Sequence, residues 1–369
     1  MKQCLFFNPI IGAKDCSNES LGNKIIKVGN NTGNLVYVET TKRELKFDKE
    51  LWLESEFERN NDVIGILPCA NMIGIHDGSC TESWASMLEK NNISTVIIGL
   101  GAQTTAELNT PKKLVNALGK DKISAVRKLC SYSNSVGIRG NFTAECLDLM
   151  GIHNYRVIGC PSVYMWKMYP YKELCRPEKK KVIFNVAYKG NGPGKIMECG
   201  MKNNGIIIMQ AMDEMPKTIF ENATIDDELV RRKYNKVSFT GAELEAFLHT
   251  NAQMFFSYDE WEQYLRTGNF TFSFGNRFHG NVLSMINGIP AVWITHDGRT
   301  EELVETFELP HVSQEQYLKN DMDIDDLIGI CDYSKFYKRI EEKYTDYLAF
   351  LKENNLELKE ELECLPKEY

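Results

Sequence analysis

An arginine and a histidine stand two residues apart in the segment FGNRFHGNVLSMINGIP, which runs from Phe274 to Pro290. Arg277 carries a planar guanidinium that can bind a carboxylate or a phosphate through two parallel hydrogen bonds. His279 carries the side chain that exchanges a proton near neutral pH. The pair suits a site that binds an anion and moves a proton. An ion-paired arginine beside a helix-capping histidine would give the same spacing, so both interpretations stay open.

The elements on either side of this pair favour an anion site. FTFSFG, from Phe270 to Gly275, predicts a strand, and NVLSMIN predicts a short helix that ends at Gly288 and Pro290. The start of a helix presents free N–H groups and the positive end of the helix dipole, which attract anions. We therefore expect the backbone amides after Gly280 to contribute to binding.

Other polar residues also follow apolar strands. Arg139, in VGIRGNFTAECL, repeats the strand–arginine–helix order of Arg277, so a second arginine could hold a dianion from the opposite side. Gln103 ends the apolar segment STVIIGLGAQ, and Asp297 follows AVWI in THDGRT. Asp297 and Arg299 could face the same cleft, although for each residue alone a turn with an aspartate cap and an exposed arginine is the simpler interpretation. His76 with the adjacent aspartate is a weaker acid–base candidate.

The segment GNNTGN, which contains Asn30, Asn31 and Asn34, is rich in glycine and asparagine and precedes a predicted helix. Small residues and side-chain amides suit the close approach of a polar ligand, although a plain loop has the same composition. The segment matches neither GxGxxG nor GxxxxGK[ST], so neither a dinucleotide nor a P-loop site is predicted. Metal-ligand spacing such as HExxH does not occur either, and we expect no metal.

Two series of short apolar runs alternate with amphipathic segments and must position these residues. DVIGILP, STVIIGLGAQ and NYRVIGCPS form the first series, and KVIFNVA, GIIIMQA, AQMFFS and PAVWIT form the second. Such alternation predicts parallel sheets covered by helices. A polar stretch with Pro and Lys, residues 169–181, predicts the linker. We therefore expect an α/β protein with two Rossmann-like domains, 1–170 and 180–330, and a C-terminal helix within 331–369 packed on them. The site should lie in the cleft, beyond the carboxyl ends of the strands.

The composition limits the classes of partner. The 369 residues are 43% hydrophobic, which is enough for two cores, and the net charge of −8 argues against general affinity for nucleic acid or anionic lipid. The eleven cysteines include no CxxC pair, so we expect a reducing cytoplasm and no disulfide framework. The N-terminal apolar run is too short for a signal peptide, and no segment approaches the ~20 apolar residues of a membrane span.

The order of these segments resembles the polysaccharide pyruvyltransferase family. GNNTGN, VIIGLGAQ, IRGNFTAECLDLMGIHNYRVIGCPS and RFHGNVLSMINGIPAVWITHD follow one another as in that family, from about Gly29 to Pro310. The most specific part is Arg-x-His-Gly with its Gly-x-Pro exit. The chain departs from the family at two places: PCAN, residues 68–71, stands where many members carry glycines, and GCPS, residues 159–162, stands where others carry an Asp-Pro-Ala type of stretch.

The resemblance implies a GT-B-like fold and transfer of pyruvate from phosphoenolpyruvate to two hydroxyls of one sugar. The product is a cyclic ketal on a polysaccharide or lipid-linked precursor, and phosphate is released. Arg277 and His279 match the family's donor-binding and catalytic pair, and Arg139 matches the arginine of its R-x-x-[ST] segment. His279 would act as a general acid at C3 of the donor, or alternatively would protonate the departing phosphate. The second domain would bind the donor and the first the acceptor.

The expected site follows from this match. The expected donor-binding residues are Arg139, Arg277, His279, Gly280 and Asn281, and the expected acceptor or cleft residues are Asn30, Asn31, Asn34, Gln103 and Asp297. Phosphoenolpyruvate would be a co-substrate, with no further cofactor. Two other functions are compatible with the same residues: a GT-B glycosyltransferase that uses a nucleotide sugar, and a non-catalytic member that binds carbohydrate. We expect a cytoplasmic protein, at the inner membrane face if the acceptor is lipid-linked, and a homo-oligomer is compatible with the sequence.

Overall fold

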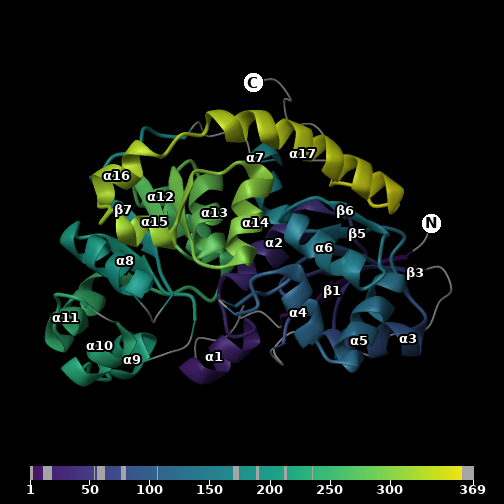
Figure 1. The fold of residues 1–369 in the computed structure, drawn as a ribbon, viewed down its shortest axis with the longest axis horizontal. Coiled ribbons are helices and arrows are strands. Elements are labelled where there is room, and N and C mark those ends of the chain that lie inside the picture. The colour runs from purple at the N-terminus through teal and green to yellow at the C-terminus, as the bar shows by residue number, and fades with distance from the viewer. Residues whose placement is uncertain are drawn as a thin grey trace.

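Two parallel sheets of six strands form the framework of the computed structural model (Figure 1). The structure describes residues 3–10, 19–53, 55, 63–75, 80–105, 107–168, 174–187, 191–211, 214–234 and 236–359. Every strand pairing within the two sheets is parallel. Parallel neighbours require a crossover on one face of the sheet, and helices supply most of these crossovers. The predicted α/β class with two Rossmann-like sheets is confirmed.

The first sheet has the strand order β2-β1-β3-β4-β5-β6. Its strands are β1 (Gln3–Asn8), β2 (Lys49–Trp52), β3 (Val63–Pro68), β4 (Ser94–Leu100), β5 (Val136–Ile138) and β6 (Tyr155–Val157). Its helices are α1 (Leu21–Lys27), α2 (Asn34–Glu44), α3 (Thr81–Asn91), α4 (Pro111–Ala117), α5 (Lys120–Ser131) and α6 (Asn141–Leu149). Buried apolar runs such as that of β4 form the central strands because both faces of the sheet are covered.

The second sheet has the order β12-β11-β10-β7-β8-β9. Its strands are β7 (Val182–Asn185), β8 (Ile206–Ile208), β9 (Ala252–Gln253), β10 (Phe272–Gly275), β11 (Ala291–Thr295) and β12 (His311–Ser313). Its helices are α8 (Asn191–Lys202), α9 (Glu214–Glu221), α10 (Asp227–Lys233), α11 (Gly241–Asn251), α12 (Tyr258–Thr267), α13 (Phe278–Ile286), α14 (Gly298–Phe307), α15 (Gln314–Lys319) and α16 (Ile324–Gly329). A 3-10 helix, Pro161–Tyr164, and α7 (Met165–Met168) leave the first sheet toward the second.

The last helix, α17 (Ser334–Glu353), spans both sheets, as Figure 1 shows in yellow. Just before it, the Tyr333 hydroxyl donates to the carbonyl of Ala291 in β11 at 2.8 Å. Toward its end, the Tyr347 hydroxyl donates to Glu44 Oε2 in α2 at 2.8 Å. The helix therefore contacts the second sheet near its start and a helix of the first domain near its end, and so it joins the two.

The helix that contains His279 begins earlier than the sequence pattern predicts. NVLSMIN predicts a start near Asn281, whereas α13 begins at Phe278 and has Arg277 as its N-cap. The backbone of Arg277 is extended, with φ −98° and ψ 109°, so the helix begins directly after it. As a result His279 lies in the first turn of the helix rather than in a preceding loop, and the backbone N–H of Asn281 donates to the carbonyl of Arg277 instead of being free for a ligand.

Candidate active site

A cavity lies at the carboxyl ends of strands from both sheets. It is lined by Asn31, Asn34, Ala70, Asn71, Arg139, Gln210, Asn276, Arg277, Phe278, His279, Arg299 and Leu303. The lining segments follow β3, β5, β8, β10 and β11, which is where ligands bind in sheets of this kind. Three arginines therefore meet at one cavity in a chain of net charge −8. The cavity is locally basic and suits an anion carrying more than one charge.

Arg139 is held with its guanidinium in a fixed plane. Only 2% of the residue is exposed. Its Nε donates to the carbonyl of Gly99 at 2.9 Å, its Nη1 to Asn71 Oδ1 at 3.0 Å, and its Nη2 to the carbonyl of Cys69 at 3.4 Å. A guanidinium has five N–H groups, and the three contacts just described use three of those of Arg139. The other two have no partner in the described part of the chain and are available to a ligand. Cys69 and Asn71 belong to the first departure from the family pattern, and their structural role is to orient this arginine.

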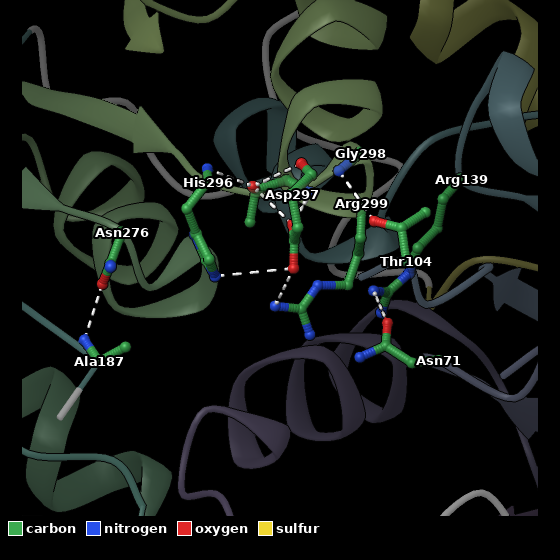
Figure 2. A network of polar contacts seen from close by, with 10 residues as sticks. Asn71, Thr104, Arg139, Ala187, Asn276, His296, Asp297, Gly298 and Arg299 are labelled. Carbon is green, nitrogen blue, oxygen red and sulfur yellow. Dashed lines mark hydrogen bonds and ion pairs between the residues drawn. The ribbon is translucent and has the colours of Figure 1, made fainter. Parts of the chain in front are cut away.

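Arg299 is the third arginine, and an aspartate orients it. Asp297 is the N-cap of α14 and accepts from the backbone N–H of Thr300 at 2.8 Å. Its Oδ2 lies 3.1 Å from Arg299 Nη2 and 3.6 Å from His296 Nε2, and Figure 2 shows it between these two side chains. Burial acts to raise the pKa of Asp297, but the charges of Arg299 and His296 and the hydrogen bonds from Thr300 together outweigh it and hold that pKa below its usual range. Asp297 does not line the cavity; it positions Arg299, which does.

His279 is 9% exposed and faces the cavity from the first turn of α13. Burial, and then the charges of Arg139 and Arg299, lower the pKa of His279 well below its usual value. Its Nε2 lies 3.5 Å from the sulfur of Cys160, and its ring centre lies 5.5 Å from that of Tyr37. The imidazole is therefore neutral at pH 7 while the cavity holds no anion.

Gly280 and Asn281 do not line the cavity. Asn281 is fully buried; its Nδ2 donates to the carbonyls of Gly275 and Val292, and its Oδ1 accepts from the side chain of Asn185. A Cβ at Gly280 would lie 2.0 Å from Asn185 Oδ1, so only glycine allows this close approach. Both residues therefore hold α13 against its sheet, which places Arg277 and His279.

The loop that precedes α2 brings two of its three asparagines to the cavity. Asn31 Oδ1 accepts from the backbone N–H of Gly33, and Asn34 Nδ2 donates to the carbonyls of Val28 and Gly29. Both side chains thus stabilise the loop, and both line the cavity. Asn30 is exposed, in a left-handed conformation with φ 61°, and is not among the lining residues.

Two further sequence candidates lie elsewhere. Gln103 follows β4, where its backbone N–H donates to the carbonyl of Ile73 at 2.7 Å, and it does not line the cavity. His76 and Asp77 are outside the described residues. The second departure from the family pattern does reach the site, through the contact of Cys160 with His279. The sequence left Arg299 open between a cleft residue and an exposed arginine in a turn, and the structure places it at the cavity.

Close to the cavity, α14 is bonded to the first sheet's domain by buried contacts. Glu302 accepts from the backbone N–H of Thr143 at 3.0 Å and from its hydroxyl at 2.8 Å. The backbone N–H of Gly298 donates to Thr104 Oγ1 at 2.9 Å (Figure 2). Burial raises the pKa of Glu302 to about 7, although both hydrogen bonds from Thr143 oppose the change. The protonation state of one carboxyl group is thus linked to the contact between the two domains.

Two further findings concern metal binding and membrane spanning by the described residues. Across the ranges given above, no three His, Cys, Asp or Glu side chains gather in a way that could hold a metal ion. None of the helices in those ranges combines the length and apolar character needed to cross a membrane.

Comparisons with solved structures give weak similarities. A protein of uncharacterized function from Klebsiella pneumoniae matches at 11% identity and a TM-score of 0.39, with 82% of this chain and 88% of that chain covered. A putative UDP-N-acetylglucosamine 2-epimerase from Listeria monocytogenes matches at 10% identity and a TM-score of 0.40, with 94% and 93% covered. Similarity at this level says nothing about the reaction of this chain. No match was found among curated proteins.

The comparison with protein families is decisive. The family model described as polysaccharide pyruvyl transferase matches residues 31–298, which is well over half of the chain. The matched segment begins in the loop before α2 and ends at the start of α14, and it includes Arg139, Arg277 and His279. The chain belongs to the polysaccharide pyruvyl transferase family, and it is a pyruvyltransferase.

Proposed function

We propose that the protein transfers pyruvate from phosphoenolpyruvate to two hydroxyls of one sugar in a polysaccharide or lipid-linked precursor. The product is a cyclic ketal, and phosphate leaves. The observation that carries this proposal is the meeting of Arg139, Arg277 and Arg299 at one cavity. Phosphoenolpyruvate has a phosphate and a carboxylate on the same carbon, C2, and three guanidinium groups suit such a ligand in charge and in hydrogen-bonding capacity.

The guanidinium groups of Arg139 and Arg299 are each already oriented within their own domain before the donor arrives. The carbonyls of Gly99 and Cys69 and the side chain of Asn71 already fix Arg139, and Asp297 already fixes Arg299. Fixed charges lose little entropy and little solvation when the ligand arrives, so they stabilise charge that develops during the reaction. Arg277 adds its charge at the start of α13, where free backbone N–H groups also attract an anion.

His279 would provide the proton that the reaction needs. In the empty site, burial and then the charges of the arginines keep it neutral, but the negative charge of a bound donor offsets that of the arginines and raises its pKa. We propose that the histidine takes up a proton as the donor binds and delivers it to C3 of the enol phosphate, while the first sugar hydroxyl attacks C2 and gives its proton to the imidazole that this transfer leaves neutral. The bond from C2 to the phosphate oxygen then breaks, and the second hydroxyl attacks C2. Its proton leaves with phosphate; protonation of that leaving group by His279 is the alternative role.

Donor binding would require the walls of the cavity to move apart. The cavity is about 40 Å³, room for about one water molecule, whereas a phosphorylated three-carbon acid is several times larger. Its walls come from both domains, so widening of the cleft would admit the donor and closure would exclude water from the reaction. The buried contacts of Glu302 and Gly298 with the first domain would break and re-form in this motion.

The proposal is tested by phosphate release. Purified protein is mixed with phosphoenolpyruvate and a panel of free and lipid-linked galactosides, and phosphate is measured over time. Release that depends on the saccharide and disappears in His279→Ala supports the proposal, and absence of release with every acceptor counts against it. Thermal-shift measurements with phosphoenolpyruvate and with a panel of nucleotide sugars address the alternatives: stabilisation by a nucleotide sugar alone would favour a glycosyltransferase. Stabilisation by carbohydrate alone, with no turnover, would favour a binding protein.

A further inference from the structure

Asn276, directly before Arg277, has a fixed side chain at the cavity. The residue is 2% exposed and is among those that line the cavity. Its Oδ1 accepts from the backbone N–H of Ala187 at 2.7 Å, a contact drawn in Figure 2, and its own backbone N–H donates to the carbonyl of Asn185 at 2.9 Å. Because Oδ1 accepts from an N–H group, the orientation of the amide is settled, and Nδ2 is the other atom.

The Nδ2 of Asn276 is buried and has no hydrogen-bond partner among the residues that the structure describes. A buried amide N–H₂ that bonds to nothing is unfavourable, and such groups are rare in folded proteins unless a ligand or water completes them. The neighbouring buried amides differ. Asn281 uses both its nitrogen and its oxygen, and Asn185 Nδ2 bonds to Ser273 and Asn281. Of these three amides, Asn276 is the one that lines the cavity and the one whose buried nitrogen has no partner.

We propose that Asn276 Nδ2 donates a hydrogen bond to an anionic oxygen, on the carboxylate or the phosphate, of the bound donor substrate. The inference rests on the proposed function, because it takes the donor to be phosphoenolpyruvate. Asn276 and Arg277 both line the cavity, so a ligand held there by the guanidinium also meets the neighbouring amide. The amide adds a directed N–H group without adding charge, and so it fixes the orientation of a ligand that the arginines attract.

The decisive variant is Asn276→Asp. An aspartate has the same shape and can still accept from Ala187, but it places an oxygen where the Nδ2 donor was. We expect the dissociation constant for phosphoenolpyruvate, measured by calorimetry, to rise at least about tenfold, since a hydrogen bond to a charged group is lost and a repulsion is gained. Asn276→Ala, which removes the donor without adding charge, should weaken binding by a smaller factor. KM for the sugar acceptor should not change in either variant.

The matched control is Asn287→Asp. Asn287 caps the other end of α13, is also buried, and has its Nδ2 bonded to the carbonyl of Leu283 at 2.9 Å. It should keep the wild-type affinity for phosphoenolpyruvate, and thermal unfolding of all three variants without ligand separates a lost contact from a lost fold. If Asn276→Asp unfolds, the affinity of Asn276→Ala for phosphoenolpyruvate decides whether the inference holds.

Inorganic phosphate and pyruvate are titrated as separate probes to identify the group that is bound. Weaker binding of phosphate alone would assign Nδ2 to the phosphate, and weaker binding of pyruvate alone would assign it to the carboxylate. Wild-type affinity for phosphoenolpyruvate in both folded Asn276 variants would overturn the inference and leave the proposed function standing. A wild-type protein that binds neither phosphoenolpyruvate nor these probes would overturn the proposed function and this inference with it.

Discussion

The sulfur of Cys160 lies 3.5 Å from Nε2 of His279, so the neighbour of the proposed catalytic histidine is a neutral thiol. Burial raises the pKa of the Cys160 thiol, and Ser162 Oγ lies 3.1 Å from its sulfur. A carboxylate at this place would stabilise an imidazolium, whereas a thiol does not. Cys160 therefore does not counteract the lowering of the His279 pKa by burial and by the arginines. The departure GCPS bears on the proposed reaction: with a thiol and not a carboxylate at this contact, His279 would gain its proton when the anionic donor binds.

Replacing this thiol by an acid tests that consequence. In Cys160→Asp the carboxylate would lie beside the imidazole and raise the pKa of His279, by about one to three units for an opposite charge at such a distance. The pH dependence of kcat/KM, which reports groups of the free enzyme, should shift toward higher pH. Cys160→Ser is the matched control and should keep the wild-type profile. An unshifted profile in a folded, active Cys160→Asp variant would contradict the proposed link.

Removing the imidazole should slow the reaction more than it weakens binding. For His279→Ala we expect kcat to fall about 10²- to 10⁴-fold, the usual contribution of a positioned acid or base. KM for phosphoenolpyruvate should change by less, because the arginines that bind the anion remain. Steady-state kinetics with phosphate release as the readout measure both constants. Full activity in this variant would remove His279 from the mechanism.

The guanidinium of Arg277 should matter for its shape as well as its charge. In Arg277→Lys the charge remains, but the two parallel hydrogen bonds to a carboxylate or phosphate are lost. We expect KM for phosphoenolpyruvate to rise about tenfold or more, as for the loss of a hydrogen bond between charged groups. Arg339→Lys is a suitable control, since Arg339 is partly exposed and pairs with Glu342 at 2.8 Å. If KM is the same in Arg277→Lys as in wild type, this arginine does not contact the donor.

Glu302 should make stability depend on pH. Its pKa in the folded protein is about 7, above the ordinary value of 4.5, so the folded state holds this proton more tightly than the unfolded state does. The contribution of Glu302 to the free energy of unfolding is full below pH 4.5 and is lost as the pH rises to 7. In total this contribution is up to about 3 kcal/mol. Glu302→Gln keeps the shape without the titration, so its thermal unfolding midpoint should rise relative to wild type between pH 5 and pH 8. Glu89→Gln, at an exposed ion pair with Lys128, is the surface control for the substitution itself. If the difference in unfolding midpoint between Glu302→Gln and wild type does not vary with pH, the raised pKa of Glu302 is refuted.

The sequence predicts the framework and the arginine–histidine pair because both depend on local pattern. Apolar runs of strand length predict the two parallel sheets, and polar residues directly after strands must meet at one edge of such sheets. Arg139, Arg277 and His279 follow this rule, and all three line the cavity. The domain bounds and the roles of these residues stay predictions.

The finer details of the site depend on contacts between distant segments, which local pattern does not contain. Because α13 begins at Phe278, Asn281 turns into the core instead of toward the cavity. The bond from Arg139 to Asn71 joins residues 68 positions apart, and the contact of Cys160 with His279 joins residues 119 apart. The buried Nδ2 of Asn276 is recognisable only when all of its neighbours are in place.

The most direct test of the central claim is the structure of the product. Protein, phosphoenolpyruvate labelled with carbon-13 at C2, and the acceptor that supports phosphate release are incubated together, and the saccharide is analysed by mass spectrometry and NMR. The account predicts a mass gain of one pyruvate less one water and a labelled quaternary ketal carbon bonded to two sugar oxygens, in an amount equal to the phosphate released. Phosphate release with free labelled pyruvate and an unchanged saccharide would contradict it.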